Sequence, residues 1–285
     1  MPRAAPLIVW GALLLGVASP RAAAQPAPGD APAPNDSETA KKERLAFMLK
    51  EFATYTLSAP GAGERPLARR EEPLLRYSNP VRNSFSDAAV FLWLEGVRPR
   101  AAASISIRGN GAVGREFSSL SAEPLECRGE AGERWTPKSA GLAEQDLPDA
   151  AAPDAADKLR LVQMRGLARR FRIVMKETDT TNQTELRLLS QPIHRFAADK
   201  AGIVDGALFA FAEGTDPEAL LLLEAVRSEG ESLAWRYTLA RLTSRPLEAD
   251  LDEGRVWSAE GFWANPRSPS DPYVEIIRGS YPAAP

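Results

Sequence analysis

Cysteine and histidine are almost missing from this sequence, which has one of each in 285 residues. A single cysteine excludes an internal disulfide, and these counts also exclude zinc sites made of four cysteines, two cysteines with two histidines, or three histidines. A Cys–His catalytic pair would have to consist of Cys127 and His194. A Ser–His–Asp triad would also need His194, and no Gly-x-Ser-x-Gly motif presents a serine for it. The sequence therefore contains no recognisable catalytic constellation.

Net positive charge and long apolar runs are lacking as well. The chain has 35 basic and 38 acidic residues, a formal net charge of −3, so its overall charge does not attract nucleic acid. No stretch after residue 24 approaches the roughly 18 apolar residues of a membrane-spanning helix. The composition, 44% hydrophobic and 26% charged, is that of a globular protein.

The first 24 residues have the features of a secretory signal peptide. Arg3 supplies a positive start, Leu7–Val17 form an apolar run, and Ala22–Ala24 place small residues where signal peptidase cleaves. Retention as a membrane anchor is the alternative, but this run would span only about 16 Å of a ~30 Å hydrocarbon core. We therefore predict cleavage after Ala24 and a secreted or periplasmic protein without a transmembrane anchor.

A linker and a first helix follow the predicted cleavage site. Residues 25–34 are rich in proline and alanine and cannot form a core. Asn35–Leu57 are predicted to form an amphipathic helix, because apolar side chains recur at helical spacing at Leu45, Met48, Leu49, Phe52 and Tyr55. A second helix is expected after a long internal loop at residues 139–157, with Leu159, Val162, Leu167 and Met164 on its inner side.

Alternation of apolar and polar residues predicts about nine strands in the rest of the chain. The clearest are near residues 87–95, 103–108, 207–213, 220–226 and 233–242. Short connections favour antiparallel pairing. The predicted fold is α+β: one dominant, curved antiparallel sheet with both helices packed on it, in a single domain at residues 35–285. The strand spacing shows no fixed-period repeat, which argues against a propeller or a solenoid.

The candidate binding residues are aromatic and charged side chains that lie together on predicted strands. Trp93 and Glu95 share a strand face by alternation. Trp235 and Arg236 lie on opposite faces of a later strand, and Arg236 could pair with Glu224 on its neighbour. A pocket lined by these five side chains is one interpretation. The other is that the tryptophans belong to the core and that Arg236 and Glu224 form a cross-strand ion pair.

The predicted function is that of an exported cell-envelope or extracellular protein. The lack of a catalytic constellation favours a non-catalytic protein that binds a small ligand or an envelope protein. The alternative is a secreted hydrolase of glycans or esters that uses strand carboxylates, Glu95 or Glu224. We expect no cofactor, no metal site and no nucleic-acid partner.

Three short stretches resemble exported bacterial proteins of unknown function. They are Asn79–Arg82, Arg160–Arg165, and Gly206–Phe211 continuing into Gly214–Glu218. The resemblance covers roughly Asn79 to Trp257. It implies no activity and therefore adds no site residue.

Overall fold

The computed structural model describes residues 37–60, 66–79, 87–138, 145–177, 181–198, 201–227, 232–261 and 268–282. The chain divides into two compact units, residues 1–38 and residues 39–285. Of the first unit only Ser37 and Glu38 are described, so the predicted signal peptide, its cleavage site after Ala24 and the linker lie outside the described residues. The predicted 139–157 loop is described from residue 145 onward.

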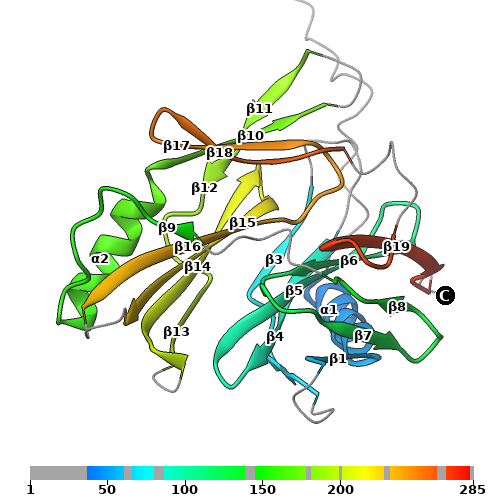
Figure 1. Cartoon of the computed structure of the whole chain (residues 1–285). Coiled ribbons are helices and arrows are strands. Elements are labelled where there is room, and N and C mark those ends of the chain that lie inside the picture. The colour runs from blue at the N-terminus through cyan, green and yellow to red at the C-terminus, as the bar shows by residue number, and fades with distance from the viewer. Residues whose placement is uncertain are drawn as a thin grey trace, which may run out of the picture. The chain divides into compact units, whose positions relative to one another are not determined.

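The elements of the second unit fall into two successive sets, each introduced by a helix (Figure 1). The first set is α1 (Glu38–Ala53), β1 (Tyr55–Ser58), β2 (Ala68–Arg69), β3 (Leu75–Tyr77), β4 (Asp87–Glu95), β5 (Arg98–Ile107), β6 (Ala112–Ser119), β7 (Glu126–Gly129) and β8 (Arg134–Trp135). After β9 (Gln145–Asp146), the second set is α2 (Asp157–Ala168), β10 (Phe171–Lys176), β11 (Gln183–Glu185), β12 (Arg187–Leu188), β13 (His194–Ala198), β14 (Ile203–Glu213), β15 (Asp216–Arg227), β16 (Leu233–Arg241), β17 (Leu247–Leu251) and β18 (Gly254–Ala259); β19 (Tyr273–Ser280) ends the described chain.

The strands form several antiparallel sheets. The first large sheet has the order β19-β6-β5-β4-β2, with β3 also paired to β4, and the second has the order β12-β14-β15-β16-β9, with β13 also paired to β14. Two small sheets have the orders β1-β7-β8 and β11-β10-β17-β18. The predicted α+β class and antiparallel pairing are confirmed. The prediction of one dominant curved sheet was wrong, because the apolar strands fall into two groups that each build a separate large sheet.

The two sets of elements are an internal repeat. We call α1–β8 repeat 1 and α2–β18 repeat 2. In repeat 1, β1 pairs with β7 and β7 with β8; in repeat 2, β10 pairs with β17 and β17 with β18. Each helix is followed in the chain by the first strand of its small sheet, then by short strands (β2 and β3, or β11, β12 and β13), and then by a three-stranded meander of the large sheet, β4–β6 or β14–β16. The spacing of the strands did not reveal this repeat, because its unit is a whole α+β half of the protein.

The strand registers match residue by residue between the repeats. In repeat 1, Ala101 of β5 lies opposite Ser119 of β6. In repeat 2, Ala219 of β15 lies opposite Arg241 of β16 at the same point of the ladder. In the loop of repeat 1, the Leu67 N–H donates to the Leu57 backbone oxygen. At the matched positions of repeat 2, the Leu186 N–H donates to the Ile173 backbone oxygen. Sequence identities fall at the matched positions, in Arg44-Leu45-x-x-Met48 and Arg160-Leu161-x-x-Met164, in Glu95-Gly96-x-x-Pro99 and Glu213-Gly214-x-x-Pro217, and in Pro124-Leu125-Glu126 and Pro246-Leu247-Glu248.

A buried Arg–Asp–Arg triad occupies the same place in both repeats. In repeat 2, Arg160 of α2 donates to Asp205 of β14 over 3.0 Å, and Arg195 of β13 donates to both oxygens of that carboxylate over 3.0 and 2.6 Å. In repeat 1, Arg44 of α1 and Arg76 of β3 donate to Asp87 of β4 in the same way. Burial raises the pKa of Asp87, but the hydrogen bonds from Arg76 and Arg44 outweigh it and the pKa is lowered.

The strand that follows each repeat in the chain pairs with the other repeat. β9 follows repeat 1 in the chain but pairs with β16, with Gln145 opposite Tyr237. β19 follows repeat 2 but pairs with β6, with Ile276 opposite Arg115. Arg115 and Tyr237 occupy matched positions, so the exchange of strands is reciprocal.

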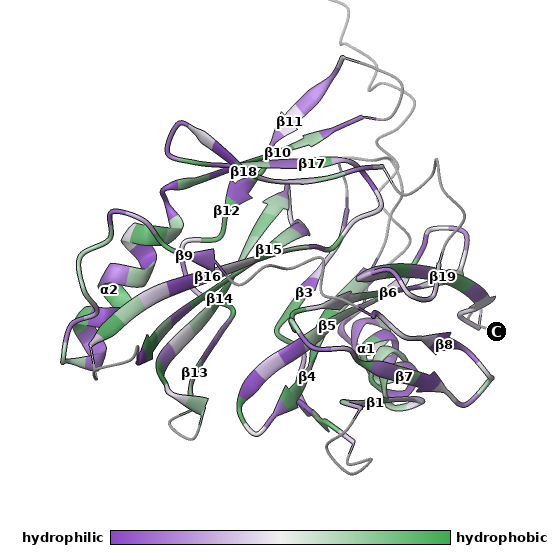
Figure 2. Cartoon of the chain, in the orientation of Figure 1, coloured by the Kyte–Doolittle hydropathy of each residue, from purple (hydrophilic) through white to green (hydrophobic). Residues whose placement is uncertain are grey.

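Both helices pack on large sheets, as predicted, but the inner face of α2 differs from the prediction. Met48 and Phe52 of α1 are buried, and the Phe52 ring stacks on Phe91 with centroids 4.7 Å apart. The predicted first helix ends early, at Ala53, and Tyr55 begins β1. The buried residues of α2 are Arg160, Met164 and Ala168, whereas Leu159 and Val162 are 52% and 61% exposed. The triad turns Arg160 inward, so Leu159 and Val162 of the predicted stripe face outward, whereas Met164 is buried and Leu167 packs against the core as predicted. Figure 2 shows β15 as largely hydrophobic and β11, at the end of its sheet, as hydrophilic.

Candidate binding site between the repeats

The two large sheets contact each other through their inner faces. The apolar contact includes Leu92, Ala102 and Leu120 of the first sheet and Leu208, Leu220, Leu222 and Ala240 of the second. The hairpin turn of each repeat reaches the other repeat: His194 Nε2 lies 3.2 Å from the Val97 oxygen, and the Thr215 hydroxyl donates to the Ser78 oxygen. These reciprocal contacts indicate an approximate two-fold relation between the repeats.

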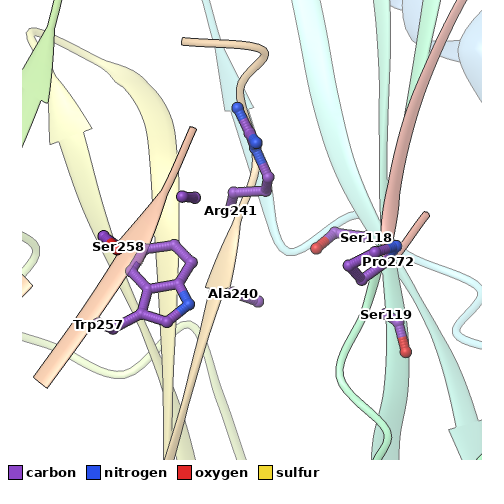
Figure 3. Close-up of a pocket in the computed structure, with 8 residues that line it drawn as sticks. Ser118, Ser119, Ala240, Arg241, Trp257, Ser258 and Pro272 are labelled. Atoms are coloured by element: carbon purple, nitrogen blue, oxygen red, sulfur yellow. The ribbon is translucent and has the colours of Figure 1, made fainter. Parts of the chain in front are cut away.

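A pocket of about 230 Å³ lies where β6 and β16 approach each other (Figure 3). Its lining comes from both repeats and from the residue before β19: Ser118, Ser119, Ala240, Arg241, Trp257, Ser258, Ala259 and Pro272. Ser118 and Ser119 are the matched positions of Ala240 and Arg241. Both repeats therefore contribute to the pocket, and repeat 2 supplies the larger share of its lining.

The lining presents an aromatic ring and hydroxyl groups. Trp257 is half-buried, and Figure 3 shows its indole between Ala240 and Ser258. The Arg241 guanidinium donates to the backbone oxygens of Thr243, Glu260 and Arg245, and it lies 5.1 Å from the centre of the Tyr273 ring. Those contacts hold Arg241 in the wall. The pocket suits a small, uncharged group with an apolar face, because apolar walls with a few polar groups are typical of ligand sites.

A buried polar network lies next to the pocket, on the inner face of the first large sheet. The Tyr273 hydroxyl donates to Glu116 over 2.5 Å, and Tyr77 and Ser104 share a hydrogen bond of 2.8 Å. Ser104 and Glu275 lie directly opposite Glu116 on the two neighbouring strands. Burial, followed by repulsion from Glu275, raises the pKa of Glu116 to about 8. Glu116 is therefore mostly protonated at neutral pH.

Trp93 and Glu95, which the sequence placed in a pocket, lie in different surroundings. Trp93 is fully buried in the core beneath α1, with its ring centroid 4.7 Å from that of Phe52. Its indole N–H has no hydrogen-bond partner among the described residues. Glu95 is 53% exposed at the end of β4 and pairs with Arg100 over 3.3 Å. A shift in register after Trp93 interrupts the alternation that was expected to place the two side chains on one face.

The other three predicted site residues lie in repeat 2. Glu224 and Arg236 lie directly opposite each other on β15 and β16. Glu224 accepts two hydrogen bonds of 2.8 Å from Arg98, while Arg236 lies 3.4 Å from Asp146. Trp235 is buried in the core beneath α2, and its indole N–H donates to the Ala151 oxygen. The structure thus brings Glu224 and Arg236 together and places Trp93 and Trp235 in two separate cores.

The remaining candidates for catalysis or metal binding are also placed. Cys127 is buried in the core beneath α1, and burial raises its pKa to about 12, so its thiol is unreactive. His194 lies on β13 of the other repeat, and burial lowers its pKa. Among the described residues, no group of three or more His, Cys, Asp or Glu side chains is arranged to hold a metal ion. No described helix is long and apolar enough to cross a membrane.

Comparisons with protein-family models, with curated proteins and with solved structures found no match to this chain.

Proposed function

We propose that this chain is an exported, non-catalytic binding protein of the cell envelope or the extracellular space, and that the pocket between the repeats is its binding site. The observation that carries the proposal is the composition of that pocket. Both repeats contribute to it, and its walls combine the Trp257 ring with Ser118, Ser119 and Ser258. Its volume of about 230 Å³ is below the ~300–1,000 Å³ of sites for drug-sized ligands, so it would hold only a small part of a partner.

Export is proposed from the sequence of residues 1–24. The positive start, the short apolar run and the small residues before Gln25 support cleavage and release. The single cysteine is compatible with an oxidising compartment, since no mispairing within one chain can occur.

The hydrolase alternative has less support. Glu224 is held by Arg98 through two hydrogen bonds of 2.8 Å, and its side chain is 3% exposed. Glu95 is solvent-exposed beside Arg100. Neither carboxylate lines the pocket beside Trp257, so no observation favours either as a general acid.

Export and binding can be tested separately with the same gene. Expression of the whole sequence in a bacterial host should give a periplasmic or secreted product. Its measured mass should be that of a chain that begins at Gln25. A full-length product retained in the cytoplasm or the membrane would contradict export.

Binding can be followed by fluorine NMR on protein that contains 5-fluorotryptophan, with the Trp257 signal assigned from W257F. Envelope glycans, peptides and small metabolites would be added one class at a time. We expect a saturable shift of the Trp257 signal with one class and little change at Trp93 and Trp235, which are buried. No response at Trp257 to any class would remove the pocket as the binding site.

A further inference from the structure

Repeat 1 contains a filled copy of the pocket. The segment Ser268–Pro272 forms a turn, closed by a hydrogen bond of 3.2 Å from the Asp271 N–H to the Ser268 oxygen, and lies beside β8. The Trp135 indole N–H donates to the Asp271 oxygen over 2.8 Å, and the Thr136 N–H donates to the Pro269 oxygen over 2.6 Å. The Ser119 N–H donates to the Pro272 oxygen over 2.9 Å. Trp135 is 1% exposed beneath this segment.

The residues that hold the segment have direct counterparts in the pocket wall. Register matches Ser119 with Arg241, and it matches Trp135, Thr136 and Pro137 with Trp257, Ser258 and Ala259. The match is supported by the small sheets, where Leu125 contacts Pro137 through a backbone hydrogen bond and Leu247 pairs with Ala259. All four counterparts in repeat 2 line the pocket. The pocket is therefore the second copy of a site that, in repeat 1, binds a turn of the chain through its backbone oxygens.

The two copies differ in what covers them. In repeat 1, the backbone beyond β8 continues to pair with the segment, through Thr136 with Pro269 and Lys138 with Ser270. In repeat 2, β18 is the last strand of its sheet among the described residues. Trp257 is half-buried where Trp135 is covered. The far wall of the pocket includes Pro272, so the filled and the open copies lie side by side.

We infer that the pocket beside Trp257 binds a turn-forming, proline-containing peptide segment of a partner protein, with the chemistry of Ser268–Pro272. The inference rests on the proposed function, since it names the partner class for the same site. The Trp257 indole N–H and the Ser258 backbone N–H are the counterparts of the two donors that hold Asp271 and Pro269. Proline suits such a segment because it lacks an N–H and its fixed φ favours the second position of a turn, where Pro269 stands.

The experiment measures the affinity of a peptide for the whole exported chain. The probe is a blocked, fluorescent peptide with the sequence Ser-Pro-Ser-Asp-Pro, and binding is followed by anisotropy. We expect saturable binding that W257F weakens about five- to tenfold, because the variant loses one hydrogen-bond donor and keeps an aromatic ring. A peptide in which alanine replaces both prolines should bind the unmodified protein more weakly than the original peptide binds W257F.

The matched control is W135F, which removes the same donor from the filled copy. It should lower the melting temperature and leave peptide affinity within twofold of the unmodified protein. Equal affinity for W257F and the unmodified protein, or no saturable binding, would overturn the inference. A glycan that shifts the Trp257 fluorine signal when the peptide does not would overturn the peptide class but retain the proposed function. If nothing shifts that signal, both proposals fail.

Discussion

Repeat 1 and repeat 2 share a scaffold and differ in the side chains that face each other between the large sheets. The Arg–Asp–Arg triad and the Glu-Gly-x-x-Pro hairpin occur in both. On the inner face, Ser104 and Glu116 of repeat 1 correspond in register to Leu222 and Thr238 of repeat 2. The shared residues therefore maintain the fold, while the residues that differ give each repeat its own chemistry.

The same division applies around the matched tryptophans. Trp135 is part of a closed contact with the C-terminal segment, and Trp257 lines an open pocket. A duplicated fold can keep one copy of a site for its own assembly and leave the other for a partner.

The largest expected effect is on the free energy of unfolding, and it shows whether the two triads contribute equally to stability. D205N and D87N each leave two arginines beside a neutral group, and removal of one partner of a buried ionic contact costs about 3–5 kcal/mol. We expect both variants to lose free energy of unfolding in this range, measured by urea denaturation. R172Q breaks a contact whose arginine is 48% exposed, and it should cost less than about 1 kcal/mol. A large loss from only one aspartate variant would show that the triads support the repeats unequally.

The second prediction concerns the carboxyl group that repeat 2 lacks. The pKa of Glu116 is raised from 4.5 to about 8, so the folded protein holds this proton more tightly than the unfolded chain does. The stabilisation is complete below pH 4.5, declines as the pH rises toward 8, and is absent above it. The free energy of unfolding should fall by at most about 1.4 kcal/mol for each pH unit in this window.

Glu116→Gln should flatten this dependence, measured by denaturation between pH 4.5 and 9. Glu123→Gln is the control, because the Glu123 side chain is 71% exposed. An unchanged slope in the Glu116 variant would assign the pH dependence to other groups.

A smaller effect is expected at a position that differs by one methyl group. Gly206 lies opposite Phe196 as Ala88 lies opposite Tyr77. A Cβ atom at Gly206 would approach the Phe196 ring to 2.4 Å, so G206A should force the ring to move and cost roughly 1–2 kcal/mol. The reciprocal variant A88G should cost about 0.5–1 kcal/mol through backbone entropy. Thermal unfolding of both would rank them, and a neutral G206A would mean that Phe196 has room to shift.

Local patterns predicted the elements better than their assembly. Alternation located the long strands near their observed bounds, because each lies in a sheet with distinct faces. The inner face of α2 was misassigned because an arginine, Arg160, takes the buried position and its partner Asp205 is far along the chain. The division into several sheets depends on which strands pair, and alternation within a strand carries no information about its partner.

The candidate site was harder to predict than the fold. Aromatic residues next to charged ones on strands drew attention to Trp93 and Trp235, but both strands bury these faces in a core. The pocket residues Ser118, Ala240 and Trp257 carry no motif. A signal was available in the internal similarity: aligning the two Pro-Leu-Glu stretches also aligns Trp135 with Trp257. Two of the stretches that resemble exported bacterial proteins, around Arg160 and Gly214, are also those in which this chain resembles itself.

The exchange of β9 and β19 sets an order of events during synthesis. The sheet of repeat 1 has its outer strand only when Tyr273–Ser280 have been made, whereas β9 is made before the strand β16 that it joins. The half of the protein that is translated first is thus the half that is completed last. Pairing between segments so distant in sequence also slows folding. If the chain is exported as we propose, this delay would keep the polypeptide unfolded until its C-terminus has been synthesised. The unfolded chain could then pass through a narrow export channel before its two halves pack together.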